Sequence, residues 1–309
     1  MQKLAAIVGP TAAGKTSIAI EAAKKINAQI ISCDSMQVYR DMDIGTAKAS
    51  QQERDLIPHY MVDIVEADQE FSVANYQLQV KSIIERLNIE NSIPILVGGT
   101  GLYYQAVVDN YHFFPLQSRN EVRDKWKNIV NNNGLVFAYE TLVRIDPEYA
   151  EKISPQDEKR IIRAVEVYEL TGKPFSQQQS RDTETYNLAV AGLYLDREVL
   201  YQRINSRVDD MIKQGLIEEV IALKKNRGEL SATARQALGY KQVLNYLDGV
   251  IDREEMIAEI KQETRRYAKR QFTWFKRDKR IRWFNVMNYS NEELVENICS
   301  YFEGQFNTL

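Results

Sequence analysis

The sequence predicts an α/β protein: a parallel sheet of the P-loop type with helices on both faces, plus a helical insertion domain. Three observations predict this class. Residues 9–16 read Gly-Pro-Thr-Ala-Ala-Gly-Lys-Thr and fit the pattern G-x-x-x-x-G-K-[ST] at every specified position. Strand and helix patterns alternate over the first hundred residues, as in parallel sheets. Helical patterns then continue alone from about residue 113 to residue 185, which indicates an insertion.

The composition sets the broad class of protein. The chain has 309 residues, 44% of them hydrophobic and 27% charged, as in an ordinary soluble protein of one large domain or two. The longest uncharged run, residues 91–108, contains Pro94 and three glycines, which argues against a membrane span. The first apolar stretch is too short for a signal peptide, and two isolated cysteines do not form a disulfide framework. We therefore expect a cytoplasmic protein with no membrane partner.

The first strand, loop and helix form a candidate anion site. Residues 4–8 predict a buried strand, and residues 16–26 predict a helix. The loop between them would aim backbone N–H groups and the positive helix end at one point, where a polyphosphate binds. Lys15 would reach the phosphate oxygens, and the Thr16 hydroxyl would hold Mg²⁺. The alternative is a chance glycine turn before a helix. The predicted phosphate-binding residues are Gly9, Pro10, Thr11, Ala12, Ala13, Gly14, Lys15 and Thr16.

A second predicted strand, residues 28–33, ends at the first candidate catalytic residue, Asp34. Strand ends on this edge of an open α/β sheet are where ligands bind. The Asp34 carboxylate could hold Mg²⁺ through water, act as a general base, or cap the following turn. Ser35, Gln37 and Tyr39 follow at alternate positions, and their polar groups could read the edge of a heteroaromatic base.

The rest of the core continues the same alternation. Residues 72–87 predict a helix, and residues 93–97 predict a buried strand that ends in the glycine-rich turn 98–101. That turn either admits a second substrate close to the backbone or is simply a tight connection. After the insertion, residues 188–195 predict another strand, and the chain from Arg197 onward predicts helices that pack on the core. We therefore assign residues 1–112 and 186–309 to the catalytic core and residues 113–185 to the insertion.

Basic residues gather at particular places although the net charge is −3. Residues 261–282 contain ten basic and two acidic residues, a local charge of about +8. Aromatic residues interleave with them, so binding of a nucleic-acid backbone, through Lys269 and Arg270 among others, is favoured over a merely solvated helix face. Arg203 and Arg207 lie one helical turn apart and either clamp a phosphate or pair with neighbouring aspartates.

Taken together, these motifs resemble the tRNA dimethylallyltransferase (tRNA isopentenyltransferase) family in its bacterial form. The similar blocks occur in order along nearly the whole chain, at residues 9–16, 34–48, 98–103, 157–167, 207–211, 237–240 and 267–274. The resemblance implies transfer of a dimethylallyl group from dimethylallyl diphosphate to N6 of the adenosine 3′ to the anticodon of tRNA. It also implies that the glycine loop holds the donor's diphosphate, with Mg²⁺, rather than ATP.

The resemblance also implies roles for particular residues. Asp34 would be the general base on N6, Thr100 would contact the tRNA near the target base, and Arg207 would stabilise the departing diphosphate. The residues implied or expected to bind the anticodon stem-loop are Asp34, Ser35, Met36, Gln37, Thr100, Arg123, Lys159, Arg160, Ile161, Ile162, Arg163, Lys269 and Arg270. We expect a monomer.

Three other functions remain as alternatives. A P-loop kinase would place ATP on the loop and use Asp34 to activate a hydroxyl. An adenylate isopentenyltransferase would prenylate a free nucleotide, which needs neither the insertion nor the basic segment. A non-catalytic RNA-binding NTPase would hydrolyse ATP in the presence of RNA and incorporate no prenyl group.

Overall fold

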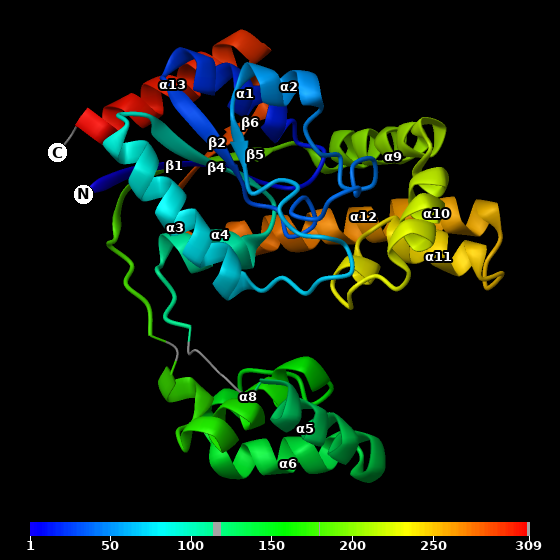
Figure 1. Ribbon diagram of the computed structural model, residues 1–309. Coiled ribbons are helices and arrows are strands. Elements are labelled where there is room, and N and C mark those ends of the chain that lie inside the picture. Colours follow the sequence, from blue (N-terminus) through cyan, green and yellow to red (C-terminus); the bar gives the residue numbers. More distant parts are fainter. Residues whose placement is uncertain (114–118, 179, 308–309) are drawn as a thin grey trace. The chain divides into compact units, whose positions relative to one another are not determined.

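The computed structural model describes residues 1–113, 119–178 and 180–307 (Figure 1). The chain divides into two compact units. The first comprises Met1–Val108 and Glu184–Leu309, and the second comprises Asp109–Thr183. The boundaries of the second unit differ by four and two residues from the expected insertion, 113–185.

The described part of the first unit is built on one parallel sheet of six strands in the order β3-β2-β4-β1-β5-β6. The strands are β1 (Gln2–Val8), β2 (Ala28–Ser32), β3 (His59–Tyr60), β4 (Ile93–Gly98), β5 (Tyr186–Tyr194) and β6 (Ile281–Asn285). In the central register, Ala5 of β1 lies opposite Ile95 of β4 and Ala189 of β5. The predicted strands at 4–8, 28–33, 93–97 and 188–195 are confirmed as β1, β2, β4 and β5.

Two strands were not predicted. Residues from Arg197 onward were expected to form helices, but Ile281–Asn285 forms β6, so that prediction is wrong there. β6 and β3 are the two edge strands of the sheet. An edge strand needs only one partner and can be short and polar. β3, with two residues, and β6, with Arg282 as its second residue, therefore show little of the apolar pattern of a strand.

Helices cover both faces of the sheet, as the sequence predicts. The helices of this unit are α1 (Lys15–Lys25), α2 (Gln51–Leu56), α3 (Val73–Ile89), α4 (Gly101–Val108), α9 (Arg197–Gln214), α10 (Leu216–Arg227), α11 (Tyr240–Leu247), α12 (Arg253–Phe275) and α13 (Asn291–Asn307). Successive residues of β1 point to opposite faces, so Leu4 and Ala6 belong to one apolar core and Ala5 and Ile7 to the other. α3, α4 and α12 pack on the first core, and α1 and α13 pack on the second (Figure 1).

The second unit is helical in its described part. Its helices are α5 (Arg119–Asn133), α6 (Leu135–Ile145), α7 (Pro147–Ala150) and α8 (Glu158–Thr171), followed by a single 3₁₀ turn at Phe175–Gln178. Gly134, with φ of +84°, separates α5 from α6, and Gly172, with φ of +68°, ends α8. The unit has an apolar core of its own around Trp126, Leu142 and Ile161.

We find no helix in the described ranges that has both the length and the apolarity needed to cross a bilayer.

Candidate active site

The glycine loop between β1 and α1 has the conformation that an anion site requires. Gly9 has φ of +143°, and a Cβ atom there would lie 2.3 Å from the carbonyl oxygen of Leu193, so only glycine fits. Gly14 is the N-cap of α1, with φ of +85°, and no side chain caps the helix there. The first N–H groups of α1 therefore lack a side-chain acceptor in the described structure and can bind phosphate oxygens.

Lys15 lies in this loop, where its Nζ atom donates a hydrogen bond to the carbonyl of Pro10 at 2.8 Å. Burial and, to a lesser extent, the neighbouring Arg207 lower the pKa of Lys15 to about 8, against the opposing effect of Asp34. A bound anion would stabilise the charged form of Lys15, which burial disfavours, so binding of an anion beside it is favourable.

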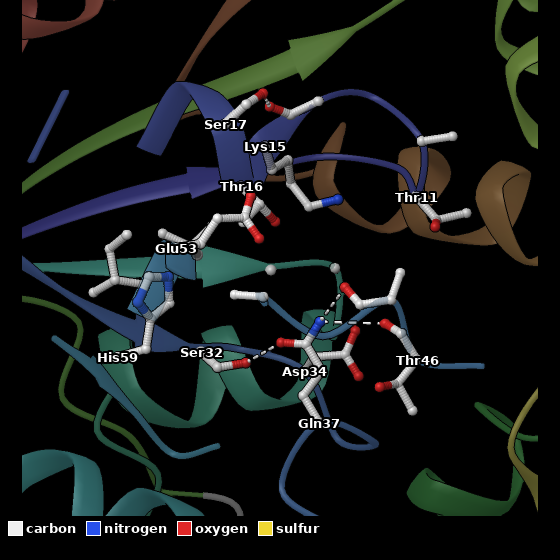
Figure 2. A pocket seen from close by; sticks show the side chains of 18 of the residues that line it. Thr11, Lys15, Thr16, Ser17, Ser32, Asp34, Gln37, Thr46, Glu53 and His59 are labelled. Atoms are coloured by element: carbon white, nitrogen blue, oxygen red, sulfur yellow. Dashed lines mark hydrogen bonds between the residues drawn. The ribbon is translucent and has the colours of Figure 1, made fainter. Parts of the chain in front are cut away.

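Asp34 lies two residues beyond the end of β2, beside Gln37 and Thr46 (Figure 2). Its Oδ1 atom accepts a hydrogen bond from the backbone N–H of Met36 at 2.9 Å, so the carboxylate does cap the turn. Asp34 also lines two adjoining cavities. The turn hydrogen bond fixes the carboxylate at the cavity wall, where its second oxygen can serve as a base.

Thr100 connects the second glycine turn to the same strand end. Its backbone N–H donates to the carbonyl of Cys33 at 3.1 Å, and its Oγ1 accepts from the N–H of Ser35 at 3.1 Å. A Cβ at Gly98 would lie 2.1 Å from the carbonyl oxygen of Cys33. The glycine turn is therefore a tight connection to the neighbouring strand end, and it holds Thr100 against Cys33 and Ser35, the residues on either side of Asp34.

Gln271 of α12 ties the glycine loop to this turn, and the sequence did not mark it as a site residue. Its Oε1 accepts from the N–H of Thr11 at 2.8 Å, and its Nε2 donates to the carbonyl of Gly99 at 3.0 Å. A Cβ at Gly99 would lie 2.0 Å from Nε2. The sequence contains one sign of this role: Gln271 falls among the packing residues of a predicted helix. A buried amide needs hydrogen-bond partners, so it indicates a polar contact there.

Two adjoining cavities meet at the candidate catalytic residues. The first, of about 300 Å³, lies over the glycine loop and is polar (Figure 2). The second, of about 290 Å³, is lined partly by apolar side chains such as Met36, Met211 and Leu238. Five residues line both cavities: Thr11, Asp34, Thr46, Arg207 and Tyr267. Two different ligand groups can therefore meet in front of Asp34.

Arg207 of α9 points toward the glycine loop, where its Nη1 atom lies 3.5 Å from Oγ1 of Thr11. Burial lowers the pKa of its guanidinium, with Asp34 opposing the shift. The aspartates that were its alternative partners are engaged elsewhere, because Asp209 pairs with Lys261 and Asp210 pairs with Lys213. Of the predicted arginine pair, Arg207 reaches the cavity and Arg203 is exposed.

The residues after Asp34 differ in how much they offer to a ligand. Ser35 and Met36 line the second cavity. The amide of Gln37 accepts from the Ser32 hydroxyl at 2.8 Å and donates to the carbonyl of Thr46 at 3.3 Å, so it mainly holds the neighbouring loop. The expectation that Tyr39 reads a base edge is wrong, because Tyr39 is fully buried in the core.

Besides Gln271, the first cavity is lined by two titratable residues that were not predicted from the sequence. Glu53 of α2 and His59 of β3 lie on the side of Thr16 (Figure 2). The Nδ1 atom of His59 lies 2.7 Å from the carbonyl of Ile57, and burial lowers the pKa of the ring. A neutral ring with its proton on Nδ1 therefore turns an acceptor nitrogen, Nε2, toward its surroundings.

The basic residues expected to bind tRNA lie in both units. Lys269 and Arg270 are exposed on α12, and Arg270 lines the second cavity. In the second unit, Lys159 and Arg160 are exposed on α8, while Arg123 and Arg163 both donate to Glu166. The expectation fails for two side chains of this segment, because they are buried in the unit's apolar core: Ile161 and Ile162.

Comparison with known proteins agrees with this geometry. Residues 37–278 match the family described as IPP transferase. The tRNA dimethylallyltransferase of Syntrophomonas wolfei is 60% identical over 307 residues, which is 99% of each chain. The chain belongs to the tRNA dimethylallyltransferase (IPP transferase) family. The resemblance seen in the sequence motifs is thereby confirmed.

Solved structures of this family share the fold. The tRNA isopentenylpyrophosphate transferase of Bacillus halodurans is 39% identical and has a TM-score of 0.76, covering 100% of this chain and 98% of its own. A eukaryotic dimethylallyltransferase acting on tRNA is 31% identical, with a TM-score of 0.80, over 92% of this chain and 74% of its own. The tRNA dimethylallyltransferase fold thus accounts for the whole described chain.

Proposed function

We propose that this chain transfers a dimethylallyl group from dimethylallyl diphosphate to N6 of the adenosine 3′ to the anticodon of tRNA and releases diphosphate. The observation that carries the proposal is the meeting of two cavities at Asp34. One cavity contains the anion-binding loop, and the other is partly apolar and open to a base. Relatives that cover this chain almost end to end are named for prenyl transfer to tRNA.

Asp34 would remove the proton from the exocyclic amine. The lone pair of an adenine N6 is delocalised into the ring, so the nitrogen is a weak nucleophile. A carboxylate that takes the proton as the C–N bond forms accelerates such a step by roughly 10²–10⁴-fold. Asp34 suits this task because the Met36 N–H fixes one of its oxygens and the cavity remains open to the carboxylate.

Lys15, Arg207 and the N–H groups at the start of α1 would stabilise the leaving diphosphate. The departing group gains negative charge as the allylic C–O bond breaks, and donors placed beforehand around that charge lower the barrier. Burial lowers the pKa of both Lys15 and Arg207, which means that both cations lack water and gain most from an anionic partner.

Mg²⁺ fits the donor atoms around the loop. The Thr16 hydroxyl and the carboxylates of Asp34 and Glu53 line one cavity. No three acidic, histidine or cysteine side chains of the described residues lie close enough together to hold a metal by themselves. Mg²⁺ habitually keeps several waters and binds through one or two protein oxygens and phosphate, so Thr16 would hold it together with the diphosphate. When bound, it would neutralise charge on the leaving group.

The target adenine must leave the anticodon-loop stack to reach Asp34, at a cost of a few kcal/mol. Lys269, Arg270 and the basic residues of the second unit would offset this cost by binding the RNA backbone. A closed site would protect the allylic donor from hydrolysis. We expect the chain to act as a monomer in the cytosol.

The test is incubation of the protein with bulk tRNA, Mg²⁺ and dimethylallyl diphosphate labelled in the prenyl group. We expect label in the tRNA and one diphosphate released for each group transferred. Transfer of labelled phosphate from ATP would instead indicate a kinase, and labelling of free adenosine monophosphate would indicate the nucleotide prenyltransferase. ATP hydrolysis that depends on RNA, with no label in the tRNA, would indicate an NTPase.

A further inference from the structure

Glu166 is a buried carboxylate in the middle of the second unit. It lies on α8 among apolar residues and is 0% exposed. Its Oε2 atom accepts one hydrogen bond from Nη2 of Arg123, on α5, and one from Nη1 of Arg163, on α8, each 2.9 Å long. Its other oxygen, Oε1, is buried and has no hydrogen-bond partner among the described residues.

The two arginines remain partly exposed while the carboxylate between them is not. The Arg123 side chain is 40% exposed and the Arg163 side chain 29%. A guanidinium has five N–H donors. Each arginine therefore keeps donors for a ligand after it has bonded to Glu166, and these donors lie on the surface of the unit.

Stability alone does not account for this carboxylate. Replacing a buried ion pair or triad by apolar side chains of similar volume is often neutral or stabilising. Burial of Glu166 also leaves Oε1 without a donor from the described part of the chain, which is unfavourable. The neighbouring positions on α8, Ile162 and Val165, are apolar and buried, so an apolar residue would suit position 166 as well.

We propose that Glu166 is a positioning residue that holds Arg123 and Arg163 together as a binding site for one phosphate group of RNA. This inference rests on the proposed function, since it names how the second unit would hold the tRNA. Glu166 itself touches no substrate. It acts through the two arginines, which would repel one another at this separation if the carboxylate were absent.

The geometry and charge of the group suit a phosphodiester. Both donating nitrogens lie 2.9 Å from the same oxygen, so they lie no more than 5.8 Å apart. Two guanidiniums at that spacing can both donate to one phosphate group. The triad has a net charge of +1, which balances the single negative charge of a phosphodiester. Lys159 and Arg160 are exposed one turn before Arg163 on α8 and add further positive charge near it.

Positioning by Glu166 and the effect of net charge predict opposite changes in RNA binding when this carboxylate is removed. Removing a negative charge from a protein should tighten its binding to RNA if only net charge matters. If Glu166 positions the arginines, Glu166→Gln should instead weaken binding. Glu169 provides a matched control, because it lies one turn later on α8 and its partners among the described residues are Lys125, at 2.5 Å, and Nε1 of Trp126, at 2.6 Å, rather than two arginines. Glu169→Gln removes the same charge.

The experiment measures kcat and KM for an anticodon stem-loop RNA, and KM for the prenyl donor, in wild type and variants. We expect Glu166→Gln to raise the KM for RNA by about tenfold, as for loss of one charge-assisted hydrogen bond, with kcat and donor KM within about twofold. Glu166→Asp, which keeps the charge, should be intermediate. Glu169→Gln should leave the KM for RNA unchanged or lower it.

A double-mutant cycle separates positioning from loss of fold. If Glu166 acts through Arg123, Glu166→Gln should have little further effect in an Arg123→Gln background. An unchanged or lowered KM for RNA in Glu166→Gln would overturn the inference, as would an equal rise in donor KM, which indicates general damage. If the wild type transferred no prenyl group, the proposed function would fail, and direct RNA binding by the same variants would still decide the role of Glu166.

Discussion

Raising the pH from 7 to 9 should weaken diphosphate binding because Lys15 loses its proton in this range. Burial and the neighbouring Arg207 lower the pKa of Lys15 to about 8. The sign follows from the charge: protonated Lys15 attracts the anion, and the neutral amine does not. Binding is therefore strongest below pH 8 and weakens above it.

The magnitude follows from the fraction of Lys15 that is protonated. With a pKa of about 8, roughly nine-tenths of the lysine is charged at pH 7 and roughly one-tenth at pH 9. If only the charged form binds, affinity falls about tenfold between these values, or about 1.4 kcal/mol. Neighbouring groups do not titrate in this window: burial raises the pKa of Cys33 to about 12 and keeps that of His59 below its usual value.

The assay is calorimetric titration of the protein with inorganic pyrophosphate at fixed free Mg²⁺, from pH 7 to pH 9. The matched control is Lys15→Arg, since a guanidinium remains charged throughout this range. Protonation of the ligand affects both proteins equally, so the ratio of their affinities isolates Lys15. If the ratio of the two affinities stayed constant with pH, the reasoning would be refuted. Either the pKa of Lys15 is not about 8, or its charge does not contribute to diphosphate binding.

Three further outcomes follow from the site. Asp34→Ala should lower the rate of transfer by at least ~10²-fold while RNA affinity stays within a few-fold, and retained activity would remove its role as base. Glu substitutions at Lys269 and Arg270 should weaken tRNA binding and flatten its dependence on salt, and an unchanged salt slope would exclude contact there. Gly9→Ala should destabilise the protein by ~1–3 kcal/mol in urea denaturation, because its φ is +143° and its Cβ would lie 2.3 Å from the carbonyl oxygen of Leu193; a stability equal to wild type would contradict this geometry.

The central sheet and the anion loop could be predicted because their signals are local. Residues 4–8 of β1 and the residues of β4 form continuous apolar runs, as strands buried on both faces must. The loop needs glycine at positions 9 and 14 and a lysine at 15, and these lie within seven residues. Edge strand β6 carries no comparable pattern, because only its side toward β5 is paired.

The support of the site was much less visible in the sequence, because it depends on contacts between distant residues. Gln271 lies 260 residues from Thr11, and Glu166 lies 43 residues from Arg123. Hydrophobic periodicity predicts which face of a helix such a side chain lies on. It does not predict which other element packs against that face. The spacing of Arg163 and Glu166 is a local ion-pair signal, but it does not show that a third residue shares the carboxylate.

The bridge that Gln271 makes has a consequence for the order of substrate binding. This side chain holds the glycine loop and the Gly99 turn at once, and the residues just before it on α12, Lys269 and Arg270, are exposed and proposed to bind RNA. A shift of α12 on binding RNA would move the N–H of Thr11, and a donor that moves Thr11 would shift α12. Reciprocity then requires that each substrate alter the affinity of the other by the same factor, whichever binds first.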